Sequence, residues 1–270
     1  MAEHDDLLEG NYADRSPDTE QERVRAKLEL FFEEKRERVF FYRQVAVQHE
    51  NEFFHWVTNR AITYLVQKGQ IKTETRALIT GGVIKLLWNR GYRYYQREAK
   101  RVVKLVEEYT HPEVGNALNQ HGIRMVLDGF ARSEFILKGQ ETNEYRGQKW
   151  HETKHYMDMI FARDGQSYGI EVKNTLMYMG YNEFKIKIRL CKALGIRPVF
   201  AVRMMPTHWV DDLRQQGGFA LILKYQLYPG GLKDLAKRIA EELELPVGTP
   251  RRLEDETMER FIAWHQKHVK

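Results

Sequence analysis

The chain has 270 residues, of which 42% are hydrophobic and 30% are charged, a balance typical of a folded globular protein. No apolar run approaches the roughly 18 residues of a membrane-spanning helix, and the acidic start lacks the layout of a secretory signal. We therefore expect a cytoplasmic protein with no membrane partner. The single cysteine, Cys191, excludes an internal disulfide and a zinc site built on several thiolates. The net charge of +5 mildly favours a polyanionic partner.

Residues 1–18 are polar and rich in acidic and turn-forming residues, so we expect a disordered tail there. A helical pattern of apolar residues begins at Thr19, and a second one runs to Gly69, which suits the end of a helix. Two extended runs follow, separated by the hairpin signal Gly81-Gly82. Helices followed by a hairpin predict a winged-helix-like DNA-binding domain over residues 19–95.

The stretch from Arg90 to Tyr109 has basic residues at near-helical spacing. We interpret four of them as contacts for the phosphates of a nucleic acid: Arg93, Arg97, Lys100 and Lys104. The alternative is a solvated helix face, opposite an apolar face that carries Val102, Leu105 and Val106.

The rest of the chain, residues 96–270, alternates helical and extended patterns, which predicts a mixed α/β core. We expect a helix from Pro112 to about Ala131, strands at 135–137, 156–162, 168–174, 198–204 and 220–227, and helices at 182–194 and 209–215. Two more amphipathic helices, around 232–243 and 258–264, form a C-terminal helical extension.

The most informative segment is the pair of runs on either side of Asp164-Gly165, a dipeptide typical of a two-residue type I′ hairpin turn. Pairing the strands about this turn brings Asp158 opposite Glu171, and strand alternation places Lys173 on the face of Glu171. Facing carboxylates repel each other unless something compensates, and a divalent cation would do so.

This arrangement suits hydrolysis of a phosphodiester, in which carboxylate oxygens hold magnesium or manganese and the metal activates a water. The carbonyl of Val172 is a further candidate ligand, and Lys173 could position the water or balance developing charge. The alternative is an ordinary hairpin with its polar face in water. Glu-x-Lys alone carries little information, because it also begins at Glu33, Glu98, Glu152 and Glu183.

Asp158 and the tripeptide Glu171-Val172-Lys173, followed by a helix and a strand, resemble the PD-(D/E)XK nuclease superfamily over roughly residues 110–205. Met157 stands where the family name has proline. The resemblance implies a restriction-endonuclease-like mixed sheet flanked by helices, with Asp158 and Glu171 as metal ligands and Lys173 as the catalytic lysine. Many members have an acidic residue on the preceding helix, for which Glu113 is the first candidate and Glu134 the second.

Residues near this hairpin have weaker assignments. Lys185, with Lys187 and Arg189 on the same expected helix, could hold phosphates or form a solvated helix face. For His151 and His155 we favour structural or solvent-facing roles, and the following aromatic residues could stack on bases or pack in the core: Trp150, Tyr178 and Tyr181.

The sequence thus predicts a Mg²⁺- or Mn²⁺-dependent endonuclease that acts on DNA, and a homodimer is expected because cutting two strands needs two active sites. Two alternatives remain open. The first is a regulator that binds DNA without cutting it. The second keeps the same chemistry and directs it at RNA or at branched or single-stranded DNA.

Overall fold

The computed structural model describes residues 19–269 and divides into two compact units. Unit 1 contains the described residues up to Val114 together with Arg238–Leu245, and unit 2 contains Gly115–Lys237 and the residues from Pro246 onward. The expected tail over 1–18 lies outside the described residues. Within 19–269, no helix combines the length and the apolar character needed to cross a bilayer.

Three helices of unit 1 form its core: α1 (Thr19–Glu34), α2 (Tyr42–Gln48) and α3 (His55–Gln67). The apolar stripe expected for α1 is buried, and Val24, Leu28 and Phe32 pack with Val57, Ala61 and Leu65 of α3. As predicted, α3 ends beside Gly69, whose φ of +66° is readily adopted only by glycine. Helix α2 was not predicted, because its mixed β-branched and aromatic sequence gives no clear period.

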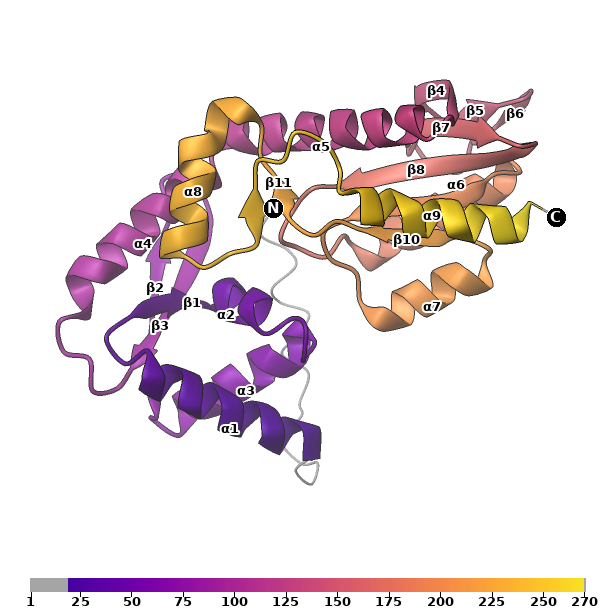
Figure 1. The fold of residues 1–270 in the computed structure, drawn as a ribbon. Coiled ribbons are helices and arrows are strands. Elements are labelled where there is room, and N and C mark those ends of the chain that lie inside the picture. Colours follow the sequence, from indigo (N-terminus) through magenta and orange to yellow (C-terminus); the bar gives the residue numbers. More distant parts are fainter. Residues whose placement is uncertain (1–18, 270) are drawn as a thin grey trace. The chain divides into compact units, whose positions relative to one another are not determined.

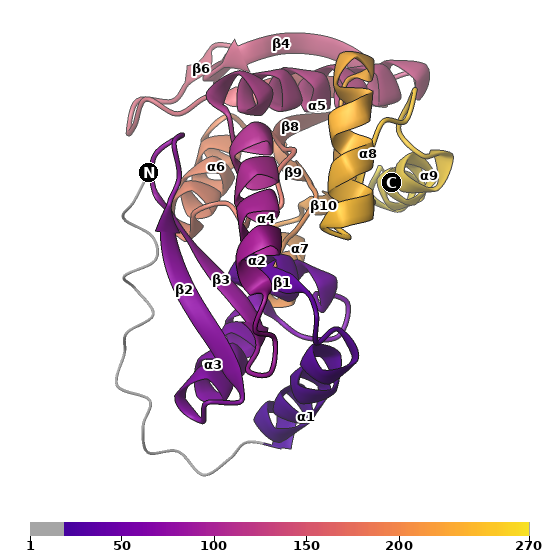
Figure 2. The same cartoon turned by 90° about the vertical axis from the view of Figure 1, so that its left-hand side faces the viewer.

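The sheet of unit 1 has three antiparallel strands in the order β1-β3-β2: β1 (Val39–Phe41), β2 (Ile71–Ala77) and β3 (Val83–Asn89). The predicted hairpin is present, with Gly81 and Gly82 at positive φ in its turn. Helix α4 (Tyr95–Tyr109) packs on β1 and β3 (Figure 2), and the rings of Trp88 and Tyr95 stack with their centres 4.0 Å apart. This helix, expected within the second domain, belongs to unit 1.

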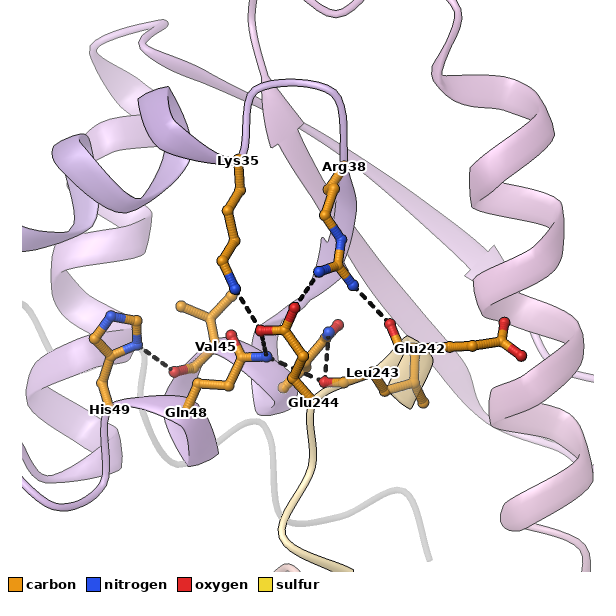
Figure 3. Close-up of polar contacts among 9 residues, drawn as sticks. Lys35, Arg38, Val45, Gln48, His49, Glu242, Leu243 and Glu244 are labelled. Carbon is orange, nitrogen blue, oxygen red and sulfur yellow. Dashed lines mark hydrogen bonds and ion pairs between the residues drawn. The ribbon is translucent and has the colours of Figure 1, made fainter. Parts of the chain in front are cut away.

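A segment from late in the chain completes unit 1, which the sequence did not suggest. After helix α8 (Lys233–Glu242) the chain lies against α2 and the turn before β1 (Figure 3). Arg38 donates a hydrogen bond to the Glu242 carbonyl at 2.7 Å, and Gln44 donates to that of Leu243 at 2.9 Å. Glu244 forms ion pairs with both Lys35 and Arg38. These contacts join residues about 200 positions apart in sequence.

Unit 2 is built on a mixed five-stranded sheet in the order β10-β9-β8-β7-β4. Its strands are β4 (Ile136–Thr142), β7 (Met157–Arg163), β8 (Gln166–Lys173), β9 (Arg197–Val202) and β10 (Phe219–Ile222). The pairs β4–β7 and β7–β8 are antiparallel, whereas β8–β9 and β9–β10 are parallel. Strands β5 (Glu144–Tyr145) and β6 (Gln148–Lys149) form a separate small hairpin.

Helices cover both faces of this sheet, which confirms the predicted mixed α/β class (Figure 1). On one face, α5 (Pro112–Arg132) and α9 (Asp255–His268) bury a core around Val126, Phe130 and Phe261. On the other face, α6 (Tyr181–Ala193) and α7 (Thr207–Gln215) bury residues such as Phe184 and Leu213. The sheet is therefore buried on both sides, and its charged side chains need partners.

Asn174 fixes the chain directly after β8. Its side-chain amide donates to the carbonyls of Leu118 and Leu227 at 2.8 and 2.7 Å, and its Oδ1 accepts from Leu227 N at 2.7 Å. These bonds hold Gln226 and Leu227 as β11, paired with β12 (Val247–Gly248) and separate from β10. The single strand expected over 220–227 was therefore wrong.

We expect Gly122→Ala to lower the free energy of unfolding of the protein by about 1–3 kcal/mol, because close-packed sites tolerate added atoms poorly. A Cβ at this position of α5 would lie 2.7 Å from the Asn174 Cβ. Gly115→Ala on the same helix is the matched control, since a Cβ there meets nothing within 4 Å. It should stabilise by about 0.5–1 kcal/mol. Urea unfolding measures both, and an equal gain in the two variants would contradict the packing argument.

Candidate functional site

The β7–β8 hairpin brings Asp158 and Glu171 together as the sequence predicted. Asp164 and Gly165 form the turn with φ of 49° and 78°, and the strands pair from Arg163↔Gln166 to Met159↔Ile170. This pairing ends one position before Asp158, which is still close enough to Glu171 for that carboxylate to raise its pKa. One Asp158 oxygen, Oδ2, accepts a hydrogen bond from the Val172 backbone N–H at 2.7 Å.

Glu171 is almost completely buried, with 1% of its surface exposed. Two lysines compensate for this burial. Lys173 Nζ lies 3.0 Å from Oε1, and Lys187 Nζ lies 2.5 Å from Oε2. An ionised carboxylate without such partners would be expelled or neutralised, since desolvation of a charge costs several kcal/mol. Both oxygens of the predicted metal ligand therefore face ammonium groups.

Helix α6 supplies the rest of this charge network. Lys187 reaches Glu171 and also donates to the carbonyl of Tyr156, while Glu183 Oε1 lies 2.9 Å from Lys173 Nζ. Positive and negative groups thus alternate from Lys187 through Glu171 and Lys173 to Glu183. The two α6 residues are four positions apart, so they lie on one side of the helix.

Sequence reasoning missed the roles of these two α6 residues. Lys187 was considered only as a phosphate contact, and Glu183 only as part of a competing Glu-x-Lys. The available signal was position: Lys187 lies in the buried stripe of α6, together with Phe184, Leu190 and Cys191. A lysine on the apolar face of an amphipathic helix needs a buried partner, and Glu171 is that partner.

The two carboxylates also shift the proton affinities of the site. Burial and the neighbouring Glu171 raise the pKa of Asp158 to about 6. Burial alone would lower the pKa of Lys173, but the carboxylates of Glu171 and Glu183 outweigh it and raise that pKa above its usual value. Lys173 therefore carries its positive charge at neutral pH and can serve as an electrostatic group rather than as a base.

The donor set fits a hard divalent cation in its chemistry, because carboxylate oxygens are the ligands that magnesium and manganese prefer. Glu171 Oε2 is buried and accepts no hydrogen bond of ordinary geometry from the described residues, although Lys187 lies beside it. Within residues 19–269, no cluster of three or more His, Cys, Asp or Glu side chains has a geometry that could hold a metal. A metal here would rely on Asp158, Glu171, backbone oxygen and water.

The two candidates for a third carboxylate differ in their surroundings, and Glu113 belongs to unit 1. Glu113 begins α5 with a side chain that is 91% exposed and has His111 as its neighbour at 3.9 Å. Glu134 follows α5 and lies 3.8 Å from Arg163, at the far end of β7 from Asp158. Five residues of extended strand span about 16 Å, so Glu134 is too distant. The role of the Val172 carbonyl stays a prediction.

The predicted substrate contacts are exposed. Four of them lie on the exposed face of α4 or just before its first residue, and no carboxylate of the described residues pairs with them: Arg93, Arg97, Lys100 and Lys104. They belong to unit 1, whereas Asp158 and Glu171 belong to unit 2. Lys185 points away from the buried stripe of α6, with its Nζ 4.2 Å from the centre of the Tyr181 ring.

Two of the neighbouring residues have local structural partners. Trp150 is buried, and its Nε1–H donates to Thr153 Oγ1 at 2.9 Å. The ring of His155 contacts the same hydroxyl group at 2.9 Å. Tyr181 is 43% exposed and leans on Trp209. Of the aromatic residues proposed to stack on bases, Trp150 therefore packs in the core, and Tyr181 keeps part of its ring accessible.

We expect Asp158→Asn to raise the free energy of unfolding by about 1–3 kcal/mol at pH 8 in EDTA. The folded-state pKa of about 6 lies above the ordinary value of 3.8, so the folded state is penalised once Asp158 ionises. The stability gained by the variant should shrink as the pH falls from about 6 to about 4. Below that pH it should vanish, because Asp158 of the wild type is then protonated in both the folded and the unfolded state. Asparagine can still accept the Val172 hydrogen bond through its carbonyl.

Asp164→Asn is the control of opposite sign. The hydrogen bond from His265, at 3.0 Å, lowers the pKa of Asp164, so its ionised form stabilises the folded state. This variant should lose stability at pH 8 and approach wild type in acid. Chemical unfolding measured from pH 4 to pH 8 gives both profiles. A loss of stability for Asp158→Asn at every pH would contradict the stated electrostatics.

Comparison with protein-family models found no match to this chain. Curated proteins and solved structures likewise gave no match. The interpretation of the site rests on its register, burial and charge.

Proposed function

We propose that the chain is a metal-dependent nuclease that hydrolyses phosphodiester bonds in DNA. The observation that carries the proposal is the pair Asp158 and Glu171 on facing strands, with Lys173 two residues along β8. Facing carboxylates in a nearly buried position are costly to maintain, and a hydrolytic metal site is a chemical use that accounts for them.

In this proposal Asp158, Glu171 and the Val172 carbonyl hold Mg²⁺ or Mn²⁺. Such a cation, when bound, would supply polarisation of the phosphate and a water of lowered pKa. Lys173, kept protonated by Glu171 and Glu183, offers its ammonium group to the negative charge that develops on the phosphate. Glu183 is a second carboxylate on the Lys173 ammonium and so restricts where that group can lie.

The architecture of unit 2 supports the proposal. The mixed sheet presents Asp158 and Glu171 on its two central antiparallel strands, and α6 followed by parallel β9 comes directly after them. This is the order expected of a restriction-endonuclease-like core, which we therefore propose for unit 2. Two such centres would be needed to cut both strands of a duplex, so the proposal includes a homodimer.

Unit 1 supports a DNA-binding role. Its elements run α1, β1, α2, α3, β2, β3 with a sheet in the order β1-β3-β2, and on this order we propose a winged-helix-like unit. We propose that it binds duplex DNA and that the basic face of α4 contacts phosphates. The exposed Tyr94, at 85%, lies at the start of that face.

A second candidate function has one observation in its favour. Both oxygens of Glu171 are occupied by lysines, as in a purely structural ion-pair network. In that case the chain would be a DNA-binding regulator, and its binding would not depend on divalent cations.

The decisive assay incubates the wild-type protein with duplex, single-stranded, junction and RNA substrates in Mn²⁺, Mg²⁺ or EDTA. We expect cutting of DNA that needs the metal and falls at least about 100-fold in Asp158→Ala, Glu171→Gln and Lys173→Met. Glu152→Gln, an exposed member of another Glu-x-Lys, is the control and should cut normally. Metal-independent binding without cutting of any substrate would favour the regulator, and cutting of RNA alone would redirect the proposal to RNA.

The role of α4 has a separate test. Replacing Arg97, Lys100 and Lys104 together by glutamine should lower the slope of log K against log salt by about 2 to 3, since each phosphate contact contributes about 0.9. The matched control neutralises Lys233, Arg251 and Lys267, three exposed residues elsewhere, with the same change in net charge. Equal effects of the two triple variants on duplex binding would show that only net charge matters.

A further inference from the structure

Lys187 occupies an unusual position in the proposed metal site. Its side chain is 5% exposed, although it carries an ammonium group, and Nζ lies 2.5 Å from Oε2 of Glu171. Lysine is rarely buried to this extent without a specific partner. The helix α6 could place a leucine here without disturbing its apolar stripe, so the charge itself needs an explanation.

The Lys187 ammonium acts electrostatically on both carboxylates of the pair. It contacts Glu171 directly, and its charge acts on Asp158 more strongly than that of Lys173 does. Lys173 pairs with the other oxygen of Glu171, and its ammonium group is shared with the carboxylate of Glu183. Of the two lysines, Lys187 therefore contributes more to compensating the carboxylate pair, which is the electrostatic task of a bound metal.

The contact between Lys187 and Glu171 is one that can be exchanged. Glu171 Oε2 accepts no hydrogen bond of ordinary geometry from the described residues, so the contact is a charge pairing without directional bonding. Lys187 also donates to the Tyr156 carbonyl, and its Nζ lies 5.2 Å from the centre of the Tyr156 ring. The ammonium group would keep these partners if it left Glu171.

We propose that Lys187 is a built-in counterion that holds Asp158 and Glu171 together in the metal-free protein and is displaced from Glu171 Oε2 by a divalent cation. This inference rests on the proposed metal site. It adds that metal binding competes with an internal positive charge, so the affinity for metal is set partly by α6. A lysine that served only packing would not affect metal affinity.

The test is the affinity of the full-length protein for Mn²⁺ alone, measured by electron paramagnetic resonance of the free ion. Lys187→Met should bind Mn²⁺ about tenfold more tightly than wild type, because a nearby positive charge no longer opposes the cation. In EDTA the same variant should melt at a lower temperature, and Mn²⁺ should raise its melting temperature more than that of wild type.

Three further variants keep the test decisive. Lys187→Gln removes the charge and keeps a hydrogen-bond donor, and it replaces the methionine variant if that one does not fold. Lys192→Gln, an exposed residue on the same helix, controls for net charge and should leave the Mn²⁺ affinity unchanged. Lys173→Met identifies the alternative in which the other lysine is displaced.

Unchanged Mn²⁺ affinity in the Lys187 variants, tighter binding in Lys173→Met alone, or no Mn²⁺ binding by any variant would each overturn the inference. Cutting is assayed separately on the same preparations. Tighter Mn²⁺ binding by the Lys187 variants, in a protein that cuts no nucleic acid, would support this inference while the nuclease proposal fails. Metal-dependent cutting of nucleic acid, with the Mn²⁺ affinity of the Lys187 variants unchanged, would support the nuclease proposal while this inference fails.

Discussion

A carboxylate that is 1% exposed, that of Glu171, is the constraint on which the centre of unit 2 depends. Its burial requires nearby positive charge. Among the described residues, Lys173 of β8 and Lys187 of α6 reach its oxygens, so α6 must lie close enough for Lys187 to pair with Glu171. Removing either partner would leave an uncompensated charge in the sheet, which is far more costly than losing an exposed ion pair. The same charge network holds the groups suited to bind a metal.

The surrounding fold orients this network from three sides. The turn at Asp164 and Gly165 sets the register that brings Asp158 to Glu171. Asn174, directly after β8, ties the end of that strand to α5 and to the segment at Leu227. At the opposite end of the sheet, the buried His265 of α9 bridges Tyr168 and Asp164. The strands that carry the candidate site are thus held at both ends.

Unit 1 is stabilised by contacts between distant parts of the chain. The residues around Glu244 complete it through Arg38, Gln44 and Lys35 (Figure 3), so folding of unit 1 depends on a segment made after most of unit 2. Loss of that segment would remove the Leu243 carbonyl and leave the buried amide donor of Gln44 without its acceptor, which is costly in an apolar setting. The two units are therefore not simply consecutive pieces of sequence, and removal of the C-terminal third would damage both of them.

The sequence by itself determined the local features: the amphipathic faces of α1 and α3, the two hairpins, and the proximity of Asp158 to Glu171. These follow from short-range periodicity and from turn residues, whose preferences act over a few positions. Tertiary structure decided which charged groups form pairs. Lys187 stands on the apolar face of its helix, but its partner could not be identified from the sequence, nor could those of Glu183 and Glu244. Pairing depends on which segments pack together. The strand break near Leu227 has the same cause, since the Asn174 side chain that diverts the chain lies 53 residues away.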